Sequence, residues 1–236
     1  TETDVLTING SQLNYKAFGT SSIMIGDTTT GTIDAANYNT GLGVDVFAAL
    51  TSGDENTAVG TGALGSSTTA SGNTAVGRNA LLANTTGTRN TALGYATLDA
   101  STTGDYNTAV GGLALSTNTT ADNNTGVGFQ ALYLNTTGAN NTAVGALSLD
   151  AVTEGDYNTG VGFTSGSKIT TGTRNVALGA FANQEGTTGN DNTYVGYAAG
   201  AATTTSSNNT AVGKSAMAAN TTGSENTAVG QISMDA

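Results

Sequence analysis

Cysteine, histidine, proline and tryptophan are all absent from the 236 residues of this chain. Without cysteine there are neither disulfides nor thiolate metal sites. Without histidine the chain lacks the side chain that most readily transfers protons near neutral pH. Average usage of roughly 5% would supply about a dozen prolines, and a backbone whose N–H groups nearly all donate to a ladder of hydrogen bonds excludes proline. These absences favour extended β-structure, and we expect no enzymatic activity.

Charged residues are few and unbalanced. Seventeen acidic residues against six basic ones give a net charge of −11. The basic residues are scattered singly, whereas binding to a phosphate backbone needs clustered Lys and Arg. No apolar run approaches the roughly 18 residues that would span a bilayer. We therefore expect no nucleic-acid partner and no insertion into a membrane. Because the chain begins at Thr1 with no signal-peptide pattern, we also expect a processed product or a fragment.

The chain does contain a repeat of 17 residues, which runs without insertion or deletion from residue 39. Self-similarity at a fixed period indicates a repeat architecture. Residues 39–236 form twelve units, the last one incomplete, and residues 22–38 fit the same register as a degenerate unit. Position 1 of every unit is asparagine: Asn39, Asn56, Asn73, Asn90, Asn107, Asn124, Asn141, Asn158, Asn175, Asn192, Asn209 and Asn226.

Glycine is abundant, with 34 residues, and it recurs at positions 5 and 15 of the unit. Glycine at fixed places marks corners where the chain takes a positive φ or passes close to a neighbour. Position 15 is otherwise only Ala or Ser, as at Ala70, Ala121 and Ser206. The corner glycines at position 5 are Gly43, Gly60, Gly77, Gly94, Gly111, Gly128, Gly145, Gly162, Gly179, Gly196, Gly213 and Gly230.

Between these corners, "NTAVG" predicts a short strand, "xxALxx" a second short strand, and "NTTG" a turn toward the next unit. A unit of this length with two glycine corners predicts one coil of an all-β, parallel β-solenoid. Stacked coils repeat every ~4.8 Å, so the position-1 asparagines form a ladder whose amides bond along the stack. Asparagine as a simple turn former is the alternative. A short helical turn at "ALLAN" or "ALYLN" in each unit also remains open.

The expected core of each coil is small. It consists of Val or Leu at position 4, a small residue at position 8, and usually Leu, Phe or Met at position 9. Burial of so few apolar side chains contributes little free energy compared with the conformational entropy that is lost when the residues of the coil become ordered. Further copies of the chain are the simplest source of more apolar contact, so we expect a homo-oligomeric rod.

The phrase "NTAVGxxALxxNTTGxx" resembles the repeats of phage tail fibres and, more distantly, the head of trimeric autotransporter adhesins. The resemblance covers residues 39–236. It implies a left-handed β-roll, assembled as an intertwined or side-by-side homotrimer, at the virion surface or outside the cell. Its implied partners are other copies of the chain, adjacent fibre domains, and a host surface glycan or protein. The adhesin repeat is shorter, which leaves the geometry of the turn around "xxNTTG" undetermined.

Residues 1–38 are less regular than the array. Residues 22–38 place Ile25 and Gly26 at positions 4 and 5. Before them, "DVLTINGSQLNYKAFG" alternates like two strands around Asn9-Gly10, a pair that favours a type I′ hairpin turn. We expect this segment to cap the first coil, whose edge groups are otherwise unpaired, or to form the junction with a preceding domain.

Acidic residues recur just before the asparagine column. Asp105 and Asp122 would lie on successive coils, where Ca²⁺ could relieve their repulsion. A solvated acidic edge is the simpler interpretation, because no known calcium-loop spacing is present. We therefore expect no cofactor, with calcium as the alternative. The "NTT" phrases at Asn84, Asn118, Asn135 and Asn220 have the form of glycan acceptor sites, but a role in the turn is the simpler explanation.

Position 6 carries an aromatic residue on every second unit between residues 90 and 208. Small residues occupy the intervening units, and position 7 is bulky where position 6 is small. This exchange of bulk predicts an interdigitated core or a seam between chains. The alternative is an exposed aromatic ladder on which the sugar rings of a host polysaccharide stack. The aromatic residues are Tyr95, Phe129, Phe163 and Tyr197.

Two functional hypotheses follow. In the first, the chain forms the shaft or head of a trimeric extracellular fibre, as in a phage tail fibre that spaces or presents host-receptor binding. A bacterial surface adhesin is a variant of this hypothesis. In the second, the chain is an ice- or surface-binding solenoid, which the threonines at positions 2, 13 and 14 suggest. A flat ice-binding face needs pairs of threonines on the same side of a strand, whereas adjacent threonines at positions 13 and 14 would point to opposite sides. The fibre is therefore the preferred hypothesis.

Overall fold

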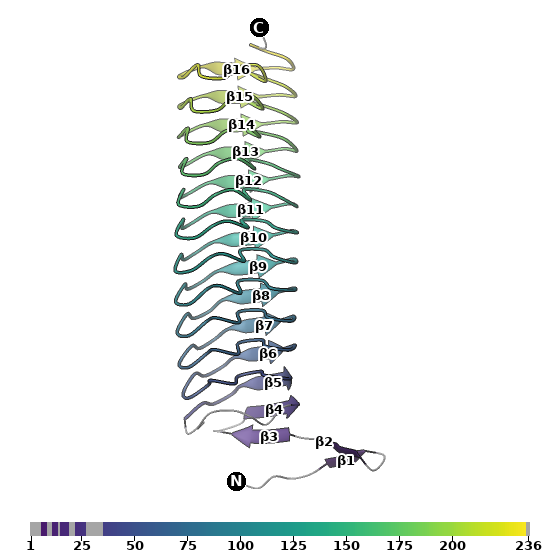
Figure 1. Cartoon of the computed structure of the whole chain (residues 1–236). Helices are drawn as coiled ribbons and strands as arrows, with labels where there is room; N and C mark the ends of the chain where they lie inside the picture. Colours follow the sequence, from purple (N-terminus) through teal and green to yellow (C-terminus); the bar gives the residue numbers. More distant parts are fainter. Residues whose placement is uncertain (1–5, 9–10, 14, 19–21, 27–34, 235–236) are drawn as a thin grey trace.

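The computed structural model describes residues 6–8, 11–13, 15–18, 22–26 and 35–234. The chain winds into a column of stacked coils, and each unit contributes one strand to a single side of the column (Figure 1). The predicted all-β parallel solenoid of 17-residue coils is confirmed. The prediction of a second strand at "xxALxx" is wrong, because these residues lie in turns, as residues 129–134 do. The helical alternative is wrong, because the described residues contain no helix and "ALLAN" lies in a turn.

One sheet runs the length of the column, in the order β3 to β16. Strands β4–β16 are parallel, and each residue pairs with the residue one unit away, as Val127 does with Val144. The strands of this sheet are β3 (Tyr15–Phe18), β4 (Ser22–Gly26), β5 (Thr40–Gly43), β6 (Thr57–Val59), β7 (Thr74–Val76), β8 (Thr91–Leu93), β9 (Thr108–Val110), β10 (Thr125–Val127), β11 (Thr142–Val144), β12 (Thr159–Val161), β13 (Val176–Leu178), β14 (Thr193–Val195), β15 (Thr210–Val212) and β16 (Thr227–Val229).

The N-terminal segment forms a separate two-stranded sheet and adds β3 to one end of the long sheet. β1 (Leu6–Ile8) and β2 (Ser11–Leu13) pair antiparallel with Ile8 opposite Ser11, as the expected hairpin requires. The turn at Asn9-Gly10 lies outside the described residues. β3 runs antiparallel along β4, so it occupies the edge where a cap was expected. β4 pairs with β5 in the predicted register, with Ile25 opposite Leu42 and Gly26 opposite Gly43.

The core is narrow and lies inside the coils. Residues at positions 1 and 3 point inward, and the position-3 residue is a fully buried alanine in most units, as at Ala75 and Ala143. Positions 8 and 9 complete the core, with Ala131 and Leu132 both buried. Leucine at position 9 has a positive φ, for example 53° at Leu132. That conformation is unfavourable for a bulky residue, and burial of the side chain holds it in place.

Position 4 does not contribute to this core. The predicted placement of Val and Leu there is wrong, because Leu42, Leu93, Val144, Val161 and Val212 are exposed. The reason is the two-residue period of a strand. Once Asn at position 1 and Ala at position 3 point inward, positions 2 and 4 must point outward. The result is an outer surface of Thr and Val that runs along the sheet, which we call the strand face.

Candidate functional site

The position-1 asparagines form a buried ladder in the structure. Asn141 shows the pattern: its backbone N–H donates to Oδ1 of Asn124 at 2.8 Å, and its Nδ2 donates to the carbonyl of Gly155 at 2.8 Å. Its own Oδ1 accepts the backbone N–H of Asn158 at 2.8 Å. Each amide thus connects its coil to both neighbours and ties position 1 to position 15. Asparagine supplies both the acceptor and the donor that this place needs, whereas an ionised carboxylate would supply only the acceptor. The Ser22 hydroxyl makes the equivalent pair of bonds in the degenerate coil, because it donates to the carbonyl of Ala36 and accepts the backbone N–H of Asn39.

A second side-chain ladder lies at position 16, where sequence analysis predicted a solvated acidic edge. Oδ1 of Asp122 accepts the backbone N–H of Asp105 at 2.7 Å, and Oδ1 of Asp156 accepts that of Ala139 at 2.7 Å. Ser71 accepts from the N–H of Asp54 in the same way. The restriction of this column to Asp, Asn, Ser, Thr and Ala was the available signal. These carboxylates therefore have a structural role, and no group of three or more metal-ligating side chains gathers among the described residues.

Threonine at position 13 forms a third ladder. Its hydroxyl donates to the carbonyl of the threonine on the next coil, as from Thr68 to Thr85 at 3.1 Å and from Thr136 to Thr153 at 3.0 Å. The asparagine at position 12 turns inward, and Asn84, Asn118 and Asn135 are buried. A buried amide cannot accept a glycan, so the turn explanation holds for these three asparagines.

The position-5 corner glycines all have a positive φ, between 120° and 140°. This region of backbone space is populated almost only by glycine. In addition, each of these glycines except Gly230 lies against the backbone of the next coil. A Cβ placed on Gly128 would lie 2.6 Å from the carbonyl carbon of Gly145. Both the conformation and the close approach therefore exclude a side chain.

The four position-6 aromatic residues lie on the outside of the coils. Tyr95, Phe129, Phe163 and Tyr197 are each 49–53% exposed, so the prediction that they line the core of the chain is wrong. The core already contains the position-3, position-8 and position-9 side chains, and the glycine corner at position 5 turns position 6 away from it. A seam between chains and an exposed ladder both remain compatible with this exposure.

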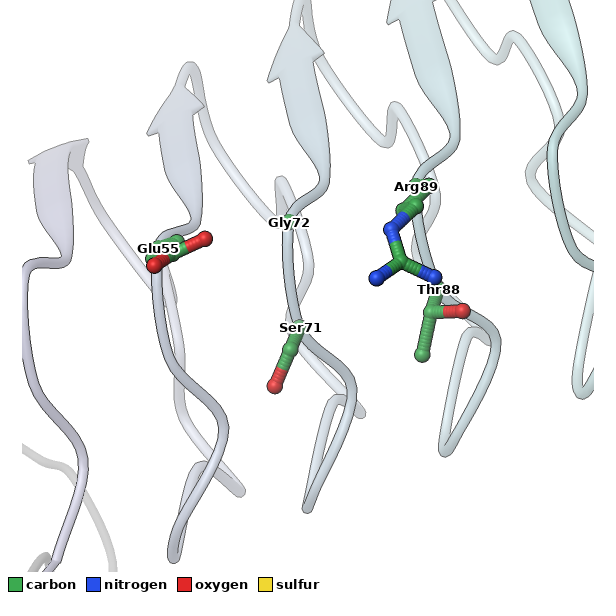
Figure 2. Close-up of a pocket in the computed structure, with 5 residues that line it drawn as sticks. All are labelled: Glu55, Ser71, Gly72, Thr88 and Arg89. Carbon is green, nitrogen blue, oxygen red and sulfur yellow. The ribbon is translucent and has the colours of Figure 1, made fainter.

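A small open notch lies at the other end of the strand from position 6, around Gly72 (Figure 2). Gly72 is the only glycine at position 17, where Glu55 and Arg89 carry side chains with the same positive φ, 60° and 55°. The missing side chain leaves the gap between those two residues, with Ser71 and Thr88 beside it. Arg89 donates to the Tyr106 hydroxyl at 2.7 Å and packs over the Tyr106 ring.

Ionisable groups are mostly exposed. Arg174 and Asp191 form an exposed ion pair at 2.6 Å, and the hydrogen bond from Arg174 lowers the pKa of Asp191. Burial raises the pKa of Asp150, whose Oδ1 has no hydrogen-bond partner. Burial also raises the pKa of Tyr194, which fills the position-3 site of its coil.

The described residues contain no helix with the length and apolar character needed to cross a membrane. Comparison of the chain with protein-family models, curated proteins and solved structures finds no match.

Proposed function

We propose that the chain is a structural protein that forms the shaft or head of a homotrimeric extracellular fibre, of the phage tail fibre type. The observation that carries this proposal is the strand face. Its outward residues repeat in register on every coil from β5 to β16: Val or Leu at position 4, and Thr at position 2 except in β13, where Val176 takes its place. An apolar surface that continues over the whole length of a chain marks an interaction site.

The distribution of charge supports association between copies. The chain carries a net charge of −11, which opposes self-association unless the acids lie away from the contact. No Asp or Glu occurs at positions 1–6 of any unit in residues 39–236. The acids lie instead at positions 7, 10, 11, 14, 16 and 17, as at Asp45, Asp99, Glu185, Glu154 and Asp156. Copies that meet through the strand face therefore keep their carboxylates in solvent.

The number of copies and the handedness rest on the resemblance to fibre and adhesin repeats. That resemblance favours three chains and a left-handed β-roll. It also favours a location on a virion or cell surface, where the rod would space or present receptor binding. A bacterial surface adhesin with the same rod is the alternative within this proposal.

Native mass tests the proposal. Multi-angle light scattering of the intact chain is expected to give three times the chain mass of 23.1 kDa. Changing Val144 and Val161 to Asp together places carboxylates in the interface, and an unpaired buried charge costs several kcal/mol. The double variant is therefore expected to be a folded monomer. A wild-type chain that is a folded monomer at micromolar concentration would refute the proposed assembly.

Position 14 provides the matched control. Thr137 is exposed on a different side of the coil, and Glu154 shows that an acid is tolerated at this position. Thr137→Asp with Thr120→Asp adds the same charge as the interface variant. This control is expected to retain the trimer mass, and loss of the trimer in both variants would point to net charge rather than the strand face.

An ice- or surface-binding solenoid is the second candidate, because the strand face offers in-register columns of Thr and Val. The position-13 hydroxyls favour it less, since they already donate to backbone carbonyls. A thermal-hysteresis assay separates the two functions. A trimer that covers its strand faces is expected to show no freezing-point depression, and a clear depression would favour the second candidate.

A further inference from the structure

The aromatic residues at position 6 form a regular exposed row beyond the strand face. Tyr95, Phe129, Phe163 and Tyr197 lie two coils apart, which is about 9.6 Å at the spacing of parallel strands. The row covers six coil steps, or roughly 29 Å. On the intervening coils, position 6 is Gly112, Ala146 or Ala180, so the rings stand separate from each other.

Packing from position 7 fixes the orientation of these rings. Phe181 lies between Phe163 and Tyr197, with ring centroids 5.5 and 5.7 Å away and interplanar angles of 85° and 79°. Leu113 and Leu147 occupy the equivalent place on the other intervening coils. Phe163 and Tyr197 therefore have a fixed base, and all four aromatic residues are about half exposed. The Arg78 guanidinium lies over the Tyr95 ring, 5.8 Å from its centroid.

The rest of the position-6 column argues against a seam between chains. Thr61, Arg78, Lys214 and Gln231 occupy this position on other coils, and all four are exposed. A seam that ran the length of the fibre would bury these polar and charged side chains. The position-4 column has no such interruption, so it fits a seam and the position-6 column does not.

We propose that these four aromatic side chains are a stacking platform for an extended neutral polysaccharide of β-1,4-linked pyranose rings. The apolar C–H face of a pyranose ring packs on an aromatic face. In an extended β-1,4-linked chain, every second ring presents the same face, and a disaccharide is about as long as the separation of neighbouring aromatics. Four aromatics two coils apart thus match alternate sugars of one chain. The platform adds glycan binding to the proposed fibre, and it rests on that proposal only for its biological setting.

Binding of cellohexaose and chitohexaose, measured by calorimetry on the full chain, tests this inference. The wild type is expected to bind at least one of them and to ignore maltohexaose, whose α-linked chain is curved. Phe129→Ala and Phe163→Ala are each expected to weaken binding about three- to tenfold. Tyr106→Ala and Tyr157→Ala remove comparably exposed rings at position 17 and are expected to leave affinity unchanged.

A ring-shift variant separates spacing from general apolar attraction. Phe129→Ala combined with Ala146→Phe keeps the number of rings but moves one ring by a single coil. It is expected to lose as much affinity as Phe129→Ala alone, and wild-type affinity in this variant would overturn the inference. A wild type that binds neither β-linked hexasaccharide would also overturn it.

Native mass and melting temperature of the same variants keep this inference separate from the proposed assembly. Both quantities are expected to stay at wild-type values in Phe129→Ala. A fall in trimer mass or a large loss of melting temperature would assign the ring to a seam and overturn the platform. A monomeric wild type that binds the glycan would refute the trimer and leave the platform standing.

Discussion

At the scale of single residues, the two recurrent glycine positions exclude side chains for different reasons. Position 5 requires a positive φ near 130° and also lies against the next coil. Position 15 has no positive φ in the described residues, and its limit is the carbonyl of the neighbouring coil. Ala70 and Ala121 show that one methyl group fits there. A corner glycine is therefore the less replaceable of the two.

Gly145→Val tests the corner. The φ of Gly145 is 132°, and a Cβ there would lie 2.7 Å from the carbonyl carbon of Gly162. Backbone strain of this kind costs about 1–3 kcal/mol, and the steric contact adds to it. We expect the variant to lose at least ~3 kcal/mol in thermal or urea unfolding. Ala146→Val is the control, because Val44 occupies the same position in another coil, and it should melt like the wild type. Normal melting of Gly145→Val would contradict the corner geometry.

Asp150 gives a prediction about pH. Burial raises its pKa above the ordinary 3.8, so the folded chain binds this proton more tightly than the unfolded chain does. The charged form therefore costs stability above the folded pKa, and that cost disappears as the pH falls through it. Asp150→Asn is expected to raise the free energy of unfolding at pH 7 by about 0.5–1 kcal/mol.

Melts of wild type and variant across pH 4–7 measure this effect. The difference between them is expected to shrink as the pH falls. Asp99→Asn is the matched control, since Asp99 occupies the same position three coils earlier and accepts from Ser116 at 2.8 Å. It should give no gain at pH 7. A gain for Asp99→Asn equal to that of Asp150→Asn would trace the effect to net charge.

At the scale of the coil, hydrogen bonds between side chains and backbone take over much of the role that apolar burial has in larger cores. The ladders at positions 1 and 13 join each coil to the next outside the three-residue strands, and position-16 side chains add further bonds between several of the coils. Only the position-1 ladder is fully buried. Because these asparagines are buried, each amide depends on its neighbours in the ladder for its hydrogen-bond partners.

Asn141→Ala tests the buried ladder. The change leaves the N–H of Asn158 without its acceptor and the carbonyl of Gly155 without its donor. Each unsatisfied buried group costs about 1–3 kcal/mol, so we expect a loss of about 2–5 kcal/mol in equilibrium unfolding. Asn140→Ala is the control at the exposed neighbouring position, where Tyr157 and Arg174 are tolerated with the same positive φ. Equal losses in both variants would argue against the ladder.

The coil also shows what the sequence could and could not predict. The 17-residue period correctly predicted the position of every strand in the array and the register of each strand pair. Equivalent positions of successive coils have the same surroundings, and the same residue types therefore recur there. The outward direction of Val at position 4 could have followed from Asn at position 1, since three positions along a strand reverse the direction of the side chain. The left-handed turns at Leu132 and Tyr157 could not, because no local preference of Leu or Tyr favours a positive φ.

At the scale of the whole molecule, stability and assembly depend on neighbours along one axis. Each coil contacts the coils before and after it, as expected for a solenoid. The strand face runs parallel to this axis, since the paired strands are stacked along the column (Figure 1). Association through that face therefore thickens the rod, whereas association through the end coils would lengthen it.

Small-angle scattering distinguishes these two modes. Twelve coils at about 4.8 Å give an array length of roughly 55–60 Å, and we expect the wild-type assembly to keep nearly this length at three times the chain mass. The Val144→Asp, Val161→Asp double variant is the control, with one third of the mass, the same length and a smaller cross-section. A maximum dimension close to twice the array length would mean that copies join end to end. The strand face would then be free in the assembly, and its Thr and Val columns would be available to another partner.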